Sequence, residues 1–363
     1  MEKKLEKIAS LEQYISIVKK YDLGNQYLRG ENQKYSSISS SLVRGYVPKN
    51  KRLGLEYIYS CLLEAYYQEV GYKLDKMQED NFLAFSQHHG LKTNLIDFTT
   101  APLVALYFAC ERDKYDVDSG FVYVLNKDDT VNASEFLCKY SIKEHFCYNI
   151  FRRLYDNDMK FVDEFRLLLE KVTSLLSRNN SYALLEYIIK QIRNYPQLKD
   201  SNSYLKERDK IDMESIGKAF KIPNLIKKYI SNFNILGSIE IMEFTAILVI
   251  FFRDIKNYGA IKELPKDISF PKMPYFMYKT PLKFDRINNQ SGVFLYQGFM
   301  DYQTHPDELG GLMVQKIIPN MVIQIYNQEE IMKELDMVGI NKRYIYGDFD
   351  NTAKYINTKF FGN

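Results

Sequence analysis

Six polar side chains lie close together in the chain, within 14 residues of mostly apolar sequence. They are Gln87, His88, His89, Asp97, Thr99 and Thr100. Imidazoles and a carboxylate can move protons or bind a cation, and hydroxyls can orient a sugar. Burying such groups costs free energy unless they have partners, so their concentration indicates a functional site. A structural interpretation stays open, in which the histidines cap a helix and bond Asp97.

A catalytic metal is one chemistry that these residues suggest, but their spacing disfavours it. Adjacent positions on a helix point about 100° apart, so His88 and His89 do not both face one ion. The sequence has no HxxxH or HxH pair, and Asp97 alone is a weak second ligand. We therefore expect no resident metal, and a metal-dependent nuclease or hydrolase is kept as an alternative.

Motifs of the common nucleophilic and nucleotide-hydrolysing enzymes are also missing. There is no GxSxG elbow, no Walker A motif and no GxGxxG. Cys110 lies in an apolar segment, where formation of a thiolate is disfavoured. These absences disfavour a serine or cysteine hydrolase, a P-loop enzyme and a Rossmann domain.

Three segments resemble motifs of the FRG domain, which occurs mainly in bacterial proteins. The central one is Gln87–Cys110, QHHGLKTNLIDFTTAPLVALYFAC, with Phe98 where the family usually has Trp. Tyr27–Gly30 resembles an aromatic-x-Arg-Gly motif, and Arg286–Phe294 resembles a late Arg-Ile-x-x-Gln-x-Gly-x-Phe motif. The settings in which FRG-like proteins occur imply a bacterial toxin or a phage-defence effector.

The order of the polar residues is also similar to that of ADP-ribosyltransferase-like enzymes of the Arg-Ser-Glu type. Those enzymes place an Arg on the first core strand, a hydroxyl pair after a later strand, and a carboxylate or amide later still. The corresponding residues are Arg29, Thr99 with Thr100, and Gln290. The similarity implies NAD as the substrate: Arg29 and Arg286 would bind it, and the threonines would orient its nicotinamide ribose.

Under this hypothesis the catalytic residues are His88, His89, Asp97 and Gln290. Gln290 departs from the pattern, because a neutral amide cannot supply negative charge to an oxocarbenium ion as Glu does. The acceptor would be a protein or a nucleic acid. The alternative function is a non-catalytic module that senses a nucleotide or dinucleotide or binds a protein, and turnover of NAD separates the two.

Rigid elements must position these residues, and hydrophobic periodicity indicates which ones. Apolar positions at helical spacing predict a helix from Phe82 that ends at Gly90. A short strand is expected at Leu95–Phe98, followed by a helix over residues 102–110 that is apolar on every side and therefore buried. Arg29 is expected on a strand that ends at Gly30.

The whole chain is expected to form an α+β fold with a central mixed or antiparallel sheet, flanking helices and a helical insertion. Residues 1–130 would form its N-terminal part, residues 131–240 a helical insertion or subdomain, and residues 241–363 its C-terminal part. Local periodicity also predicts helices over Leu5–Lys20, Gln328–Val338 and Asn351–Phe360.

Composition restricts the partners and the compartment. The chain has 49 basic and 46 acidic residues among 363, a balance that disfavours a large phosphate-neutralising surface. Its four cysteines show no CxxC spacing, which is typical of reduced thiols in a cytoplasmic protein. The N-terminal segment has no uninterrupted apolar core, and no segment reaches 18 apolar residues, so neither a signal peptide nor a membrane span is expected.

Overall fold

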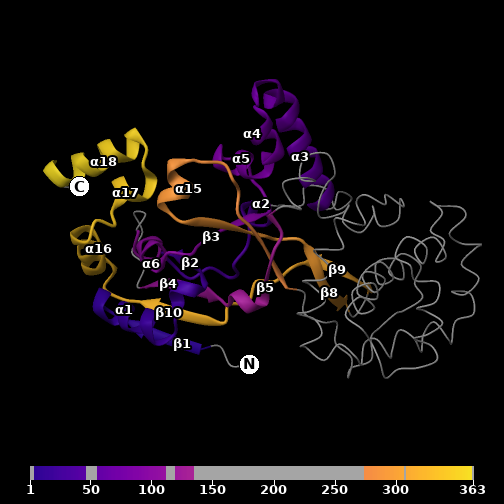
Figure 1. Ribbon diagram of the computed structural model, residues 1–363. Coiled ribbons are helices and arrows are strands. Elements are labelled where there is room, and N and C mark those ends of the chain that lie inside the picture. The colour runs from indigo at the N-terminus through magenta and orange to yellow at the C-terminus, as the bar shows by residue number, and fades with distance from the viewer. Residues whose placement is uncertain (1–3, 46–54, 112–118, 135–273, 306–307, 362–363) are drawn as a thin grey trace, which may run out of the picture.

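A computed structural model describes residues 4–45, 55–111, 119–134, 274–305 and 308–361. The expected helical insertion, residues 131–240, lies outside the described residues except at its first four positions. The described residues form a mixed sheet with helices packed against it, which confirms the α+β prediction (Figure 1).

Eight strands form the main sheet, in the order β1-β10-β4-β2-β3-β7-β6-β5. Their bounds are β1 (Lys4–Ile8), β2 (Tyr27–Glu31), β3 (Leu95–Thr99), β4 (Gly120–Leu125), β5 (Thr130–Asn132), β6 (Tyr275–Tyr278), β7 (Gly292–Tyr296) and β10 (Met321–Ile325). The β1–β10 and β5–β6 pairs are parallel, and the remaining pairs are antiparallel. Segments from both ends of the chain therefore complete one sheet.

Helices cover the face of the sheet that we call the helical face. The helices α1 (Leu11–Lys20), α6 (Pro102–Cys110) and α16 (Gln328–Met337) pack against β2, β4 and β10. Helix α6 is buried, as its apolar sequence predicts. It lies so close to β2 that a Cβ on Gly30 would be 1.9 Å from the Ala105 carbonyl oxygen, so only glycine fits there.

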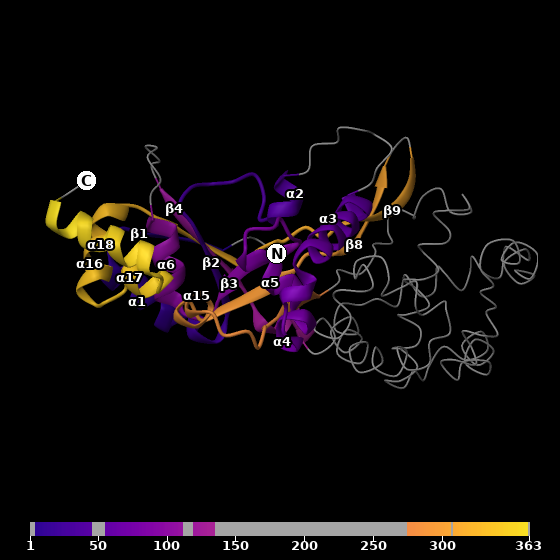
Figure 2. The same ribbon diagram turned by 90° about the horizontal axis from the view of Figure 1, so that it is seen from above.

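The remaining elements lie around this core. They are α2 (Ser41–Gly45), α3 (Leu55–Val70), α4 (Lys76–Asp80), α5 (Phe82–His88), α15 (Asp285–Asn289), α17 (Lys342–Tyr346), α18 (Phe349–Phe361) and the hairpin of β8 (Phe299–His305) with β9 (Glu308–Val314). Figures 1 and 2 place α16, α17 and α18 at one end of the molecule and the β8–β9 hairpin toward the other.

The opposite face of the sheet carries a second apolar cluster. It includes Phe98 on β3, Phe121 and Tyr123 on β4, and Val293 on β7. Because side chains alternate along a strand, each strand presents one set of residues to the helices and the other to this cluster. This alternation decides on which side of the sheet each candidate residue lies.

Local predictions were right for most elements near the site and wrong at the N-terminus. Helix α5 ends before Gly90, whose φ of +88° is accessible to glycine, and β3 follows as expected. The predicted helix over Leu5–Lys20 begins instead at Leu11, after the N-cap Ser10. Residues 4–8 pair with β10, a contact distant in sequence that overrides the local pattern.

Candidate functional site

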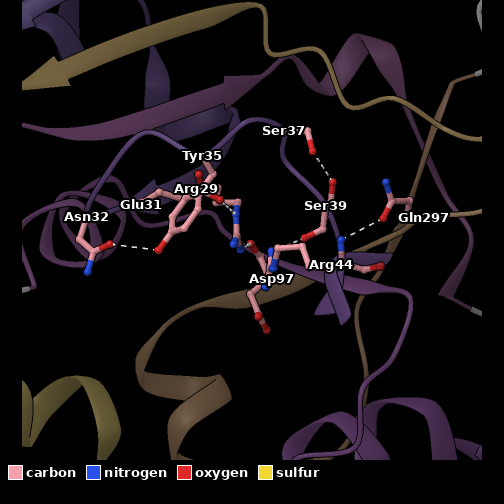
Figure 3. A network of polar contacts seen from close by, with 10 residues as sticks. Arg29, Glu31, Asn32, Tyr35, Ser37, Ser39, Arg44, Asp97 and Gln297 are labelled. Atoms are coloured by element: carbon pink, nitrogen blue, oxygen red, sulfur yellow. Dashed lines mark hydrogen bonds and ion pairs between the residues drawn. The ribbon is translucent and has the colours of Figure 1, made fainter. Parts of the chain in front are cut away.

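The site forms where β2 and β3 separate. These strands share one register pair, Leu28 with Thr99, whereas β2 pairs with β4 and β3 pairs with β7 along their whole lengths. The Arg29 side chain reaches from β2 to β3 where the two strands are not paired. Its Nε donates to Glu31 Oε1 at 2.8 Å, and its Nη1 donates to the Asp97 carbonyl oxygen at 2.9 Å (Figure 3).

The Arg29–Glu31 pair is largely removed from water. The side chains of Arg29 and Glu31 are 15% and 3% exposed. Tyr123 on β4 is the register partner of Arg29 on β2. Burial, together with the negative charge of Glu31, raises the pKa of Tyr123 to about 12. Tyr123 therefore stays a neutral phenol beside the ion pair.

A hollow of about 230 Å³ opens next to this pair; we call it the Arg29–Glu31 hollow. Besides those two residues, it is lined by Gly30, Asn32, Tyr35, Arg44, Phe108 and Glu111. Both carboxylate oxygens of Glu111 accept hydrogen bonds from phenols, those of Tyr107 and Tyr346. The Arg44 guanidinium donates to the Ser39 carbonyl oxygen and is otherwise exposed.

A second, smaller hollow of about 80 Å³ lies beside Asp97; we call it the Asp97 hollow. Its polar lining residues are Gln87, His88, Asp97, Arg286 and Gln290. Gln87 Nε2 donates to Asp97 Oδ1 at 2.9 Å, which orients the carboxylate. Asp97 Oδ2 makes no hydrogen bond to the described residues. Figure 3 shows the Asp97 side chain directed away from the Arg29 guanidinium.

The two histidines occupy different surroundings. The His88 ring stacks on Phe284 with 3.7 Å between centroids, and the residue lines the Asp97 hollow. Partial burial, followed by the charges of His89 and Arg286, lowers the pKa of His88, so its imidazole is neutral near pH 7. His89 is exposed and packs against Phe85 with 4.4 Å between centroids. The catalytic roles expected for both histidines stay predictions.

Thr99, Thr100 and Gln290 hold the chain together at the end of β3. The Thr99 hydroxyl donates to the Gln290 carbonyl oxygen at 2.6 Å and accepts from the Ala101 N–H. The Thr100 N–H donates to the Ser291 carbonyl oxygen. The Gln290 side-chain amide donates to the Ile345 carbonyl oxygen at 3.2 Å, which ties the end of α15 to α17. These bonds give the polar groups structural partners.

Arg286 is positioned differently from Arg29. It lies on α15, is exposed, and its guanidinium carbon is 5.5 Å from the centre of the Tyr346 ring. It faces the Asp97 hollow together with His88 and Gln290, whereas Arg29 lines the other hollow. The three motifs therefore meet in the fold, but their side chains line two separate hollows. The proposed role of each residue stays a prediction.

Some residues of the site were not singled out from the sequence. Glu31 lies two positions after Arg29, and period-two alternation on a strand would have indicated that they share a face. Phe284, which stacks on His88, comes from a distant segment and gives no local signal. Within the described residues, no group of three or more His, Cys, Asp or Glu side chains is arranged to hold a metal ion.

One comparison with known proteins identifies a domain in this chain. Residues 24–117 match the family model of the FRG domain, so the chain contains an FRG domain. The match includes β2, β3 and α6, whereas Arg286 and Gln290 lie beyond it.

Two further comparisons found no match. No curated protein and no solved structure matches the chain. Among the described helices, none has the length and apolar character needed to cross a membrane.

Proposed function

We propose that this protein binds NAD or a related adenine dinucleotide at the Asp97 hollow and cleaves off or transfers its ADP-ribose. One observation carries the proposal: an exposed carboxylate, an exposed guanidinium and a neutral imidazole converge on the same small hollow. These are Asp97, Arg286 and His88. Together they provide negative charge, an anion contact and a hydrogen-bonding ring, without a metal.

Each group has a specific task in the proposed reaction. The bond between C1′ of the nicotinamide ribose and the pyridinium nitrogen breaks, and its electron pair leaves with nicotinamide. Asp97 stabilises the positive charge that develops on the ribose, and this is the task that a neutral Gln290 could not perform. The ribosyl carbon then bonds to water or to a nucleophile of a target, whose proton is lost to His88 or to solvent.

The dimensions of the hollow restrict how the substrate lies. At about 80 Å³ it is smaller than the roughly 300–1,000 Å³ of sites that enclose drug-sized ligands. Only the reacting ribose would enter it. The pyrophosphate would lie outside, against Arg286, whose guanidinium can bind phosphate oxygens bidentately. Arg29 is given no task in this reaction, because its side chain bonds Glu31 and the Asp97 carbonyl oxygen and lines the other hollow.

The test is incubation of the purified protein with NAD, with and without bacterial lysate, followed by mass spectrometry of small molecules and macromolecules. We expect NAD loss or added ADP-ribose mass, reduced about 100-fold or more in Asp97→Asn. Arg286→Ala should weaken NAD binding. Arg343→Ala is the matched control, because Arg343 is also exposed and lies 5.9 Å from a tyrosine ring, but outside the hollow.

The outcomes separate the proposed function from its alternatives. Saturable NAD binding without a product would identify a sensor, and cleavage of nucleic acid would identify a nuclease. No binding, no NAD loss and no modified macromolecule would refute the proposal. For the role as a toxin or phage-defence effector, induced expression of the wild type should arrest bacterial growth, and expression of Asp97→Asn should not.

A further inference from the structure

The Arg29–Glu31 hollow contains an unusual buried group. The Glu31 side chain is 3% exposed, and only its Oε1 accepts a hydrogen bond, from Arg29. Its Oε2 is buried and has no hydrogen-bond partner among the described residues. A buried carboxylate oxygen without a partner is costly, and native structures rarely keep one without a reason.

The surroundings of Glu31 resemble a ligand site. Glu31 lines the hollow, and the terminal torsion of a glutamate is soft, so a small rotation turns Oε2 toward that space. Arg29 and Arg44 line the same hollow with guanidinium groups, which supply donors. Tyr35, 43% exposed, adds an aromatic ring at the rim (Figure 3).

Charge and volume restrict the ligand. Two guanidiniums, of Arg29 and Arg44, and two carboxylates, of Glu31 and Glu111, give the lining a formal charge of zero. A neutral ligand therefore leaves no unpaired charge in a largely buried place. The volume of about 230 Å³ is below the range for drug-sized ligands, so a single ring system fits and a dinucleotide does not.

We propose that the Arg29–Glu31 hollow binds a nucleobase that carries an exocyclic amine. The amine donates to Glu31 Oε2, and a neighbouring ring nitrogen or carbonyl oxygen accepts from Arg44 or Arg29. Tyr35 stacks on the base, an interaction that any base provides through its π-face. This inference does not rest on the proposed NAD reaction, because Asp97 and Arg286 are absent from the lining of this hollow.

Isothermal titration of the full chain with adenosine, guanosine and cytidine tests the inference. Each nucleoside is compared with its analogue that lacks the amine: purine riboside, inosine and uridine. At least one amine-bearing nucleoside should bind saturably. The affinity of its analogue should be lower by about tenfold or more, as expected for one lost hydrogen bond to a charged group. Free amino acids serve as zwitterionic probes and should not bind.

Substitutions at exposed side chains test the site without removing groups that the fold needs. Tyr35→Ala and Arg44→Ala change exposed side chains and should each weaken nucleoside binding about tenfold. Tyr72→Ala, at a tyrosine that is 80% exposed and outside the hollow, should leave nucleoside binding unchanged. Glu31→Gln should abolish the preference for the amine, with a melting curve to establish that it folds.

The inference would be overturned if no nucleoside binds, if the amine-lacking analogue binds equally well, or if Tyr35→Ala and Arg44→Ala bind like the wild type. Binding of an amino acid in place of a nucleoside would also reject it. The NAD reaction is measured by turnover and the nucleobase site by nucleoside titration, so failure of one and failure of the other are distinguishable.

Discussion

The Arg29–Glu31 pair should contribute strongly to folding. Removing one partner of a buried ion pair costs about 3–5 kcal/mol, because the other charge is left uncompensated. Arg29→Met also removes the bond to the Asp97 carbonyl oxygen, worth about 1 kcal/mol. We therefore expect this substitution to lower the free energy of unfolding by about 4–6 kcal/mol.

A double-mutant cycle in urea measures this pair directly. Glu31→Leu leaves the Arg29 charge without its partner, and Arg29→Met/Glu31→Leu removes both charges. The double variant should be more stable than Arg29→Met by about 2 kcal/mol or more, since apolar replacement of a buried pair is well tolerated. Lys333→Met, in an exposed pair with Glu330, should change stability by less than about 1 kcal/mol. An Arg29→Met loss as small as this control would refute the reasoning, as would a double variant no more stable than Arg29→Met.

Three further predictions concern the elements around the site. Gly30→Ala should lower the free energy of unfolding in urea by about 3 kcal/mol or more, because the added Cβ would collide with Ala105. The control Gly24→Ala should be nearly neutral, because nothing lies within 4 Å of the added Cβ. Equal losses would contradict the close packing of β2 on α6. The lowered pKa of His88 means that the native state binds fewer protons than the unfolded state just below pH 6.5. The contribution of His88 to stability is therefore full above pH 6.5 and is lost as the pH falls from 6.5 through the lowered pKa. His88→Asn should flatten this pH dependence of the free energy of unfolding, and an unchanged slope would count against it. His88→Ala should lower NAD turnover far more than His89→Ala, and similar turnover by the two would reject separate roles.

Local patterns were sufficient for the elements that carry the central motif. The apolar run of α6, the glycine after α5 and the short strand β3 each have a strong local signal in this sequence, and the structure follows them. The N-terminal strand β1 was missed because its stability comes from pairing with β10, near the other end of the chain. A local pattern contains no information about such a partner.

The arrangement of the candidate site was predictable only in part. The hypothesis of one NAD site grouped Arg29, Asp97 and Arg286, but in the structure Asp97 and Arg286 line one hollow and Arg29 lines another. The sequence did not indicate that β2 and β3 share only one register pair, or that the side chains of Arg29 and Asp97 line different hollows. Strand register and the stacking of His88 on Phe284 depend on tertiary contacts, which periodicity along one segment cannot report.

The central claim is that the Asp97 carboxylate drives the breaking of an N-glycosidic bond. Its most direct test is the rate of nicotinamide release from NAD by the wild type and by Asp97→Asn, measured by mass spectrometry at saturating NAD. We predict release by the wild type and a decrease of about 100-fold or more in the variant, with NAD binding retained as a thermal shift in both. Equal release by the two proteins, or no release by the wild type, would contradict the claim.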